Sequence, residues 1–137
     1  MANVRTFVDS GVLIAAATGQ KGVADFAFAV LGDPNRLFIS SDFIRLEVLP
    51  KARFHKKADE AEFYEEFFSA ASEVVPASKQ LVDAAQVEAE TAGLQAFDAL
   101  HVAAAIASKS DEIVTSEKPG ETLFRTRSMT VKTIHPG

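Results

Sequence analysis

The sequence contains no cysteine, no tryptophan and only one tyrosine. Without cysteine, the chain can form neither a disulfide nor a thiolate metal site, and a reducing cytoplasm is the compartment we expect. Its apolar runs are far shorter than the roughly 20 residues of a membrane-spanning helix. The N-terminus also lacks a basic segment followed by an apolar signal core. We therefore expect a soluble cytoplasmic protein with no membrane partner.

The chain also lacks an excess of positive charge. It carries 19 acidic side chains against 14 lysines and arginines, a net charge of −5. A broadly basic face of the kind that attracts nucleic-acid phosphates is therefore excluded. Any binding of phosphate must come from a local basic cluster or from bound metal ions.

Apolar runs typical of buried strands alternate along the 137 residues with segments of helical periodicity. We predict strands at residues 4–8, 37–40, 73–76, 113–115 and 130–134. Helices are predicted at residues 10–17, 23–31, 58–71, 78–91 and 95–108, with another that Ser41 or Asp42 caps and that Pro50 ends or kinks. This alternation favours parallel pairing through right-handed crossovers. The predicted fold is one α/β domain over residues 1–137, a three-layer α/β/α sandwich with a central, mainly parallel five-stranded sheet.

Four acidic side chains occupy similar settings far apart in the sequence. Asp9 and Glu117 follow the first and fourth predicted strands, whereas Glu47 and Asp98 lie in helices among apolar neighbours. Each has a simple structural explanation, such as a helix cap for Asp9 or a favourable helix dipole for Asp98. These explanations leave open why four separate elements each bring an acid toward the crevice beyond the strand ends, where such folds bind ligands.

Carboxylates that lie within a few ångströms of one another stay ionised together only when cations compensate their charge. Oxygen ligands without cysteine favour hard ions such as Mg²⁺ or Mn²⁺, which bridge to phosphate. Such ions lower the pKa of a bound water and stabilise a departing oxygen, so we expect hydrolysis of phosphodiester bonds. Without the four acids the chain holds 15 acidic against 14 basic side chains, and is nearly neutral.

The order and spacing of these motifs resemble PIN domains over essentially the whole chain. The residues that carry the resemblance are Phe7-Val8-Asp9-Ser10-Gly11, Glu47, Asp98-Ala99-Leu100-His101 and Thr115-Ser116-Glu117. The resemblance implies a five-stranded parallel sheet between helices and an Mg²⁺- or Mn²⁺-dependent ribonuclease. Many bacterial members are VapC-type toxins, usually homodimers held inactive by a small antitoxin. RNA, an antitoxin and a second copy of the chain are therefore the implied partners.

By position, the resemblance assigns metal ligation and catalysis to Asp9, Glu47, Asp98 and Glu117, and supporting hydroxyls to Ser10, Thr115 and Ser116. Glu117 departs from the family pattern, because an aspartate usually stands at its position. We expect a retained but altered site, in which Glu121 is a second candidate for the fourth acid.

Two other functions stay open. One is a binding module of the same fold that has weak or no turnover and acts through protein or RNA contacts. The other is a metal-dependent phosphatase of a different three-layer fold, which is disfavoured because Asp9-Ser10-Gly11 lacks the Asp-x-Asp pattern of the best-known such class.

Several residues beside the acids have both a structural and a functional interpretation. His101 lies one helical turn after Asp98 and could serve as a base, but packing and hydrogen bonding among alanines is the favoured role. A basic cluster could be a solvated helix end, a grip on an RNA backbone beside Glu47, or a dock for an acidic partner. It consists of Lys51, Arg53, Lys56 and Lys57, together with His55 and with Phe54, which could stack on a base.

His55 and His135 are predicted to be surface residues. Phenylalanines at helical spacing are predicted to lie in the core, and any part of this stripe that remains uncovered would form a dimer or antitoxin surface. They are Phe26, Phe28, Phe63, Phe67 and Phe68.

Overall fold

The computed structural model describes residues 3–136, and within this range five strands form one fully parallel sheet in the order β3-β2-β1-β4-β5. The strands are β1 (Val4–Val8), β2 (Arg36–Ser41), β3 (Glu73–Val75), β4 (Glu112–Thr115) and β5 (Val131–Thr133). The predicted α/β fold is confirmed, with a sheet that is entirely rather than mainly parallel. Of the domain predicted over residues 1–137, residues 1–2 and 137 lie outside the described range.

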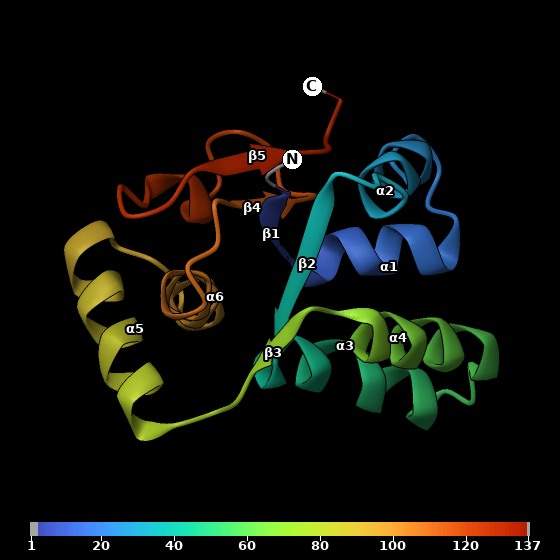
Figure 1. Ribbon diagram of the computed structural model, residues 1–137, viewed down its shortest axis with the longest axis horizontal. Coiled ribbons are helices and arrows are strands. Elements are labelled where there is room, and N and C mark those ends of the chain that lie inside the picture. The colour runs from blue at the N-terminus through green and yellow to red at the C-terminus, as the bar shows by residue number, and fades with distance from the viewer. Residues whose placement is uncertain (1–2, 137) are drawn as a thin grey trace.

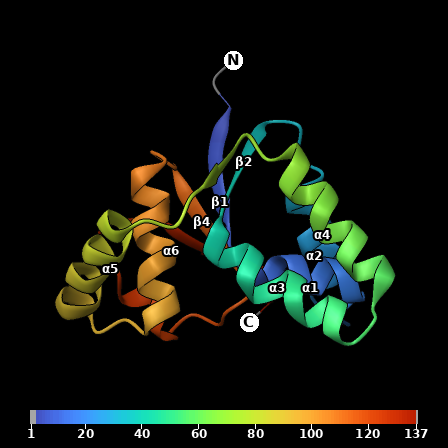
Figure 2. The same ribbon diagram turned by 90° about the horizontal axis from the view of Figure 1, so that it is seen from below.

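Helices cover both faces of the sheet, which forms the middle of three layers (Figures 1 and 2). On one face lie α1 (Ser10–Thr18), α2 (Ala24–Leu31), α3 (Asp42–Phe54) and α4 (Ala58–Ala70). On the other face lie α5 (Lys79–Ala92) and α6 (Ala96–Ala107). Among the described residues, no helix combines the length and apolar character needed to cross a membrane.

The order of the strands reverses between β1 and β4. The chain first builds β1, β2 and β3 outward, with α1 to α4 on one face, and then returns past β1 to β4 with α5 and α6 on the other. At such a reversal the connections after two neighbouring strands leave toward opposite faces, and a crevice opens at the carboxyl ends of the strands. Asp9 follows β1 and Thr115 ends β4, so both lie at this point.

The core fills the space between the layers. Phe7, Val8, Ile113 and Val114 on the two central strands are almost fully buried, because helices cover the sheet on both sides. Phe68 on α4 is also in the core, and Phe63 and Phe67 pack partly against it. The prediction of a phenylalanine core therefore holds for α4.

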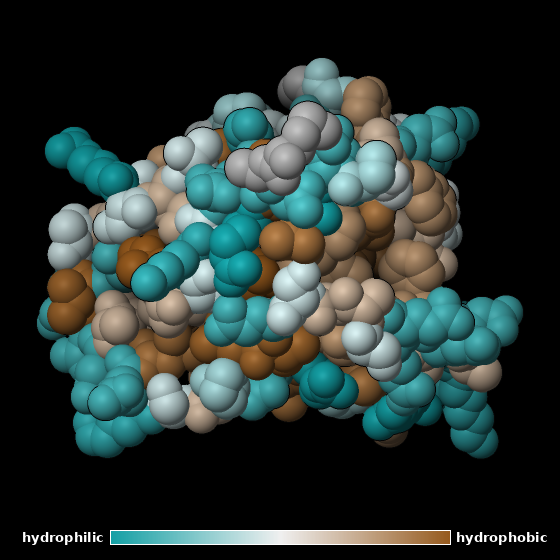
Figure 3. All heavy atoms as spheres, in the orientation of Figure 1, coloured by the Kyte–Doolittle hydropathy of each residue, from teal (hydrophilic) through white to brown (hydrophobic). Residues whose placement is uncertain are grey.

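The prediction fails for α2, since Phe26 and Phe28 are each 50% exposed. Figure 3 shows hydrophobic side chains gathered over α1 and α2 at the upper right of the molecule.

The helix ends match the sequence with one exception. Ser41 Oγ accepts a hydrogen bond from the Ile44 N–H at the start of α3, and Ser78 Oγ accepts one from Leu81 at the start of α5. Pro50 does not end α3, which continues to Phe54. This exposed proline removes one helical donor, but α3 packs along α4, and that tertiary contact stabilises the turn beyond it. The short 3₁₀ helix η1 (Thr122–Arg125) was not predicted, because four residues show no periodicity.

A buried carboxylate joins four strands away from the crevice. Glu112, the first residue of β4, is only 3% exposed and accepts a hydrogen bond of 3.0 Å from Thr6 Oγ1 on β1. Its other partners are Arg36 on β2 and Lys132 on β5, whose Nζ lies 3.0 Å from Glu112 Oε1. Burial alone would raise the pKa of Glu112, but Lys132, Thr6 and Arg36 together lower it.

Candidate metal centre

Asp9 is held in place by both strands at the reversal point. Its backbone N–H donates to the Val114 carbonyl on β4, so the residue continues the sheet before α1 begins. Asp9 Oδ1 accepts from the Ser10 N–H at 2.8 Å, and Oδ2 accepts from Thr115 Oγ1 at 2.8 Å. The side chain therefore caps α1 and also presents a buried carboxylate to the crevice. The structural and functional interpretations of Asp9 are compatible.

The segment after β4 packs tightly on the start of α1. Thr115 is fully buried, and its hydroxyl also accepts a hydrogen bond from the Glu117 N–H at 3.1 Å. A Cβ placed on Gly11 would lie only 1.9 Å from Ser116 Oγ. Glycine at this position therefore allows the close approach that puts Glu117 beside Asp9.

Glu47 on α3 and His101 on α6 meet Asp9 from opposite sides of the sheet. His101 Nε2 lies 2.7 Å from Glu47 Oε1 and 3.7 Å from Asp9 Oδ1. One ligand atom from each of these three residues lies within 4.8 Å of the other two. The structure thus brings together two of the predicted acids and a histidine for which we favoured packing and hydrogen bonding among alanines.

The neighbouring carboxylates favour the charged form of His101. Its side chain is almost completely buried, which alone would lower its pKa. The hydrogen bond with Glu47 and the negative charges of Asp9, Glu47 and Asp98 outweigh burial, so the pKa of His101 is raised. In this arrangement the imidazole compensates part of the carboxylate charge.

Asp98 lies in the first turn of α6, one helical turn before His101, and is 8% exposed. It is not within the close group of Asp9, Glu47 and His101, but it is near enough to repel the charges of Asp9 and Glu47. Burial and this repulsion raise its pKa, although Thr122 Oγ1 donates a 2.6 Å hydrogen bond to Asp98 Oδ2. Thr122 belongs to η1, and no pattern in the sequence singles out its contact with Asp98.

Glu117 is a fourth carboxylate, close enough to Asp9 and Asp98 to interact with their charges. Burial, followed by repulsion from Asp98, Asp9 and Glu121, raises its pKa to about 7. Glu117 Oε2 is buried and has no hydrogen-bond partner among the residues described. Glu121 lies close enough to contribute to this shift, and its role as the alternative fourth acid stays a prediction.

The donor set fits a hard divalent cation. Asp9 and Glu47 offer carboxylate oxygens within the close group, and Asp98 and Glu117 are near enough to interact electrostatically with Asp9. Carboxylate ligands favour Mg²⁺ or Mn²⁺. The unpartnered oxygen of Glu117 and the raised pKa values of Asp98 and Glu117 indicate negative charge that the chain itself leaves uncompensated. His101 Nε2 is the third ligand atom of the close group, and the imidazole can bind a metal only in its neutral form.

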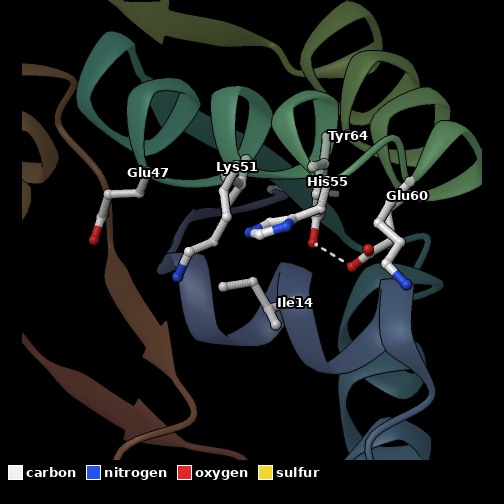
Figure 4. A pocket seen from close by; sticks show the side chains of 9 residues that line it. Ile14, Glu47, Lys51, His55, Glu60 and Tyr64 are labelled. Carbon is white, nitrogen blue, oxygen red and sulfur yellow. Dashed lines mark hydrogen bonds between the residues drawn. The ribbon is translucent and has the colours of Figure 1, made fainter.

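The predicted basic cluster divides between two environments. Lys51 and Lys57 line a pocket that begins at Glu47, together with His55 (Figure 4). Arg53 instead pairs with Glu65 on α4, and Lys56 is exposed outside the pocket lining. Phe54 is 80% exposed and contacts the His55 ring edge to face. His55 is exposed, as predicted, whereas His135 is only partly so.

The protein is thus an α/β protein with a candidate site for a hard metal ion. The site consists of carboxylates and a histidine at the point where the strand order of the parallel sheet reverses. The chain belongs to the PIN domain family, whose pattern matches residues 6–118. No curated protein matches the chain in sequence.

Three solved structures resemble the fold closely. VapBC2 from Rickettsia felis, bound to a DNA fragment from their promoter, has a TM-score of 0.70 at 16% identity and covers 95% of this chain and 98% of that one. A toxin–antitoxin complex from Klebsiella pneumoniae gives 0.70 at 18% identity, with the same coverage. DNA-bound VapBC from Salmonella typhimurium gives 0.69 at 15% identity, covering 96% and 98%. The chain therefore shares its fold with these proteins.

Proposed function

We propose that the protein is a metal-dependent endoribonuclease that hydrolyses phosphodiester bonds in RNA. The observation that carries this proposal is the group of Asp9, Glu47 and His101 within 4.8 Å, at the point of a PIN fold where the strand order reverses. Asp98 and Glu117 surround this group and supply further negative charge. A cytoplasmic location, expected from the sequence, belongs to the same proposal.

Asp9, Glu47, Asp98 and Glu117 would hold Mg²⁺ or Mn²⁺. When bound, such an ion makes water a better nucleophile at neutral pH and stabilises the negative charge of the reacting phosphate. Thr115 fixes the orientation of Asp9, and Thr122 fixes that of Asp98. His101 holds Glu47 through the 2.7 Å hydrogen bond.

Basic residues beside the site would position the RNA. Lys51 and Lys57 line the pocket next to Glu47, whereas Arg53 pairs with Glu65 and Lys56 lies outside the pocket lining. A local cluster of positive charge can bind a phosphate backbone even when the protein has no broadly basic face. The overall net charge of −5 makes this limited cluster the main attraction for RNA outside the metal site.

The proposal extends to a toxin of a toxin–antitoxin pair, with a small antitoxin and a second copy of this chain as partners. Its support is the likeness in fold to proteins solved as toxin–antitoxin complexes. Phe26 and Phe28 on α2, each half exposed, offer apolar area for such a contact.

Cleavage of single-stranded RNA in the presence of Mn²⁺ tests the activity. Wild type should cleave, while Asp9→Asn and Asp98→Asn should each lose at least about a hundredfold in rate, since each removes a charged ligand from the centre. Asp25→Asn on the exposed surface of α2 removes the same charge far from the crevice, and should cleave like wild type. Equal cleavage by all four proteins would reject the proposal, because a contaminating nuclease would then explain the activity.

A binding module of the same fold is the second candidate function. Glu117 favours it, because a glutamate stands where the family pattern usually has an aspartate. Calorimetric titration with Mn²⁺ separates the two candidates. Tight binding of Mn²⁺ together with no cleavage of any RNA would favour the binding module.

A further inference from the structure

A pocket between α1, α3 and α4 adjoins the candidate metal centre. Its cavity of about 200 Å³ has room for a single nucleobase. Glu47 belongs both to the carboxylate group and to the wall of this pocket, so the two are continuous. Figure 4 shows Glu47 at one end of the pocket and Glu60 at the other, with Lys51 and His55 between them.

The lining of the pocket changes character from its walls to its far end. Val48, Ala52 and Ile14 offer apolar surface, and the first two are buried. The Lys51 and His55 side chains extend from α3 across the opening (Figure 4). A flat apolar slot with cations at its opening suits an aromatic base whose sugar is joined to phosphate.

Polar groups at the far end present a defined hydrogen-bonding pattern. Tyr64 is buried, and its hydroxyl lies 3.5 Å from Glu60 Oε1 (Figure 4). The long distance leaves the Tyr64 hydroxyl free to donate to a better-placed acceptor. A carboxylate beside a hydroxyl therefore offers two acceptor oxygens next to one donor.

We propose that this pocket binds a guanine base of the nucleotide next to the scissile phosphate. The adjacent N1–H and N2–H₂ groups of guanine would donate to the two oxygens of Glu60, and the guanine O6 would accept from Tyr64. Uracil offers one N–H between two carbonyl oxygens, and those oxygens would face the carboxylate. The inference rests on the proposed ribonuclease function, to which it adds a base preference.

The two lysines of the pocket favour RNA over an apolar segment of a protein partner. Lys51 and Lys57 line the same small cavity as the acids Glu47 and Glu60, and a phosphate backbone would neutralise both lysines. A phosphate at the carboxylate centre would place its nucleotide at the Glu47 end of the pocket, and the base would extend from there toward Glu60 and Tyr64 at the other end. The pocket would therefore hold the nucleotide next to the metal centre.

Cleavage mapping of uridine oligonucleotides that contain one guanine, inosine or adenine tests the preference. In Mn²⁺, wild type should cleave beside guanine about tenfold faster than within uridine alone, with inosine weaker because it lacks the N2 amino group. Glu60→Gln and Tyr64→Phe should reduce that ratio toward one. Glu62→Gln is the matched control, because it removes the same charge from an exposed position on the same helix and should keep the ratio.

Binding in metal-free buffer gives a second readout that does not depend on cleavage. A short uridine oligonucleotide with one guanine should bind about tenfold more tightly than the all-uridine one. Glu60→Gln should abolish this difference, and Glu62→Gln should keep it. Equal binding of both oligonucleotides by wild type, or equal effects of the two variants, would overturn the inference and leave the pocket to a protein partner.

The two readouts also separate this inference from the proposed function. Guanine-dependent binding without any cleavage would support the pocket assignment and count against the ribonuclease. Cleavage without base preference would support the ribonuclease and overturn the pocket assignment.

Discussion

At the scale of single residues, one hydroxyl of Thr115 links two of the predicted acids. Its buried hydroxyl donates to Asp9 Oδ2 and accepts from the Glu117 N–H, so it fixes two of the four acids. We predict that Thr115→Val keeps the fold but lowers Mn²⁺ affinity about 10–100-fold, as loss of a group that orients a ligand commonly does. Calorimetric titration measures this affinity.

Thr130→Val is the control for that experiment, because residue 130 is exposed and lies just before β5. It should bind Mn²⁺ as wild type does. Unchanged affinity in Thr115→Val would show that the Ser10 N–H alone is enough to hold Asp9, or that Asp9 is not a ligand.

Glu117 makes the stability of the metal-free protein depend on pH. Its carboxyl group releases a proton near pH 4.5 in the unfolded chain and near pH 7 in the folded protein. The folded state therefore binds more protons between these values, and the free energy of unfolding falls as pH rises through this window. We predict that Glu117→Gln removes about 1–2 kcal/mol of this fall, because solvent screens a partly exposed group.

Urea unfolding at a series of pH values measures that effect. Asp98 and His101 also have raised pKa values and act in the same direction, so the comparison between wild type and variant is the informative quantity. Glu66→Gln, on the exposed surface of α4, should follow the wild-type curve. Parallel curves for wild type and Glu117→Gln would contradict the raised pKa.

The place of each acid in the chain could be predicted more readily than the contacts that hold it. Asp9 and Glu117 follow strands, and position after a strand is visible in the pattern. The distance between Glu47 and His101 is not visible, because it depends on how α3 and α6 meet from opposite faces. For the same reason, the packing role favoured for His101 omitted its contact with the carboxylates.

At the scale of secondary structure, α3 shows where local signals fail. Pro50 predicts an end or a kink, and the helix does not end there but continues for another four residues. Proline inside a helix costs about 3 kcal/mol through the missing donor and a clash with the preceding turn. The contact between α3 and α4 offsets this cost, and it cannot be predicted from the residues around Pro50 alone.

Pro50→Ala should therefore stabilise the protein. Alanine restores the N–H donor and relieves the clash, while greater freedom of the unfolded chain offsets part of the gain, so we predict a net increase of about 1–2 kcal/mol. Chemical unfolding measures the change. Pro76→Ala, in the extended segment after β3, should instead be neutral or slightly destabilising. A lower stability of Pro50→Ala would mean that α3 requires the proline geometry.

At the scale of the whole molecule, the sheet explains why distant residues form one site. The alternation of strands and helices was enough to predict a parallel sheet, and the reversal between β1 and β4 then places Asp9 next to Thr115. The short strands and η1 were less predictable, since their boundaries depend on pairing with neighbours. The pocket at Glu60 and Tyr64 was not predicted either, because three helices form it.

The integrity of this sheet should depend on Glu112, which joins β1, β2, β4 and β5 away from the crevice. Glu112→Gln leaves Arg36 without its buried anionic partner, and we predict a loss of about 2–4 kcal/mol in the free energy of unfolding. Glu73→Gln provides the matched control. Glu73 also begins a strand and pairs with an arginine, Arg5, but its side chain is 44% exposed, so its loss should cost less than about 1 kcal/mol.

The pH dependence separates this ionic contribution from a loss of packing. The folded-state pKa of Glu112 is lowered, so its stabilisation is present above about pH 4.5 and is lost as acid protonates it in the folded protein. The difference between wild type and Glu112→Gln should therefore narrow as pH falls below about 4.5. A difference that stays constant across the acid range would show that shape, rather than charge, makes Glu112 necessary. Equal losses in Glu112→Gln and Glu73→Gln would show that the four-strand junction adds nothing beyond an ordinary surface ion pair.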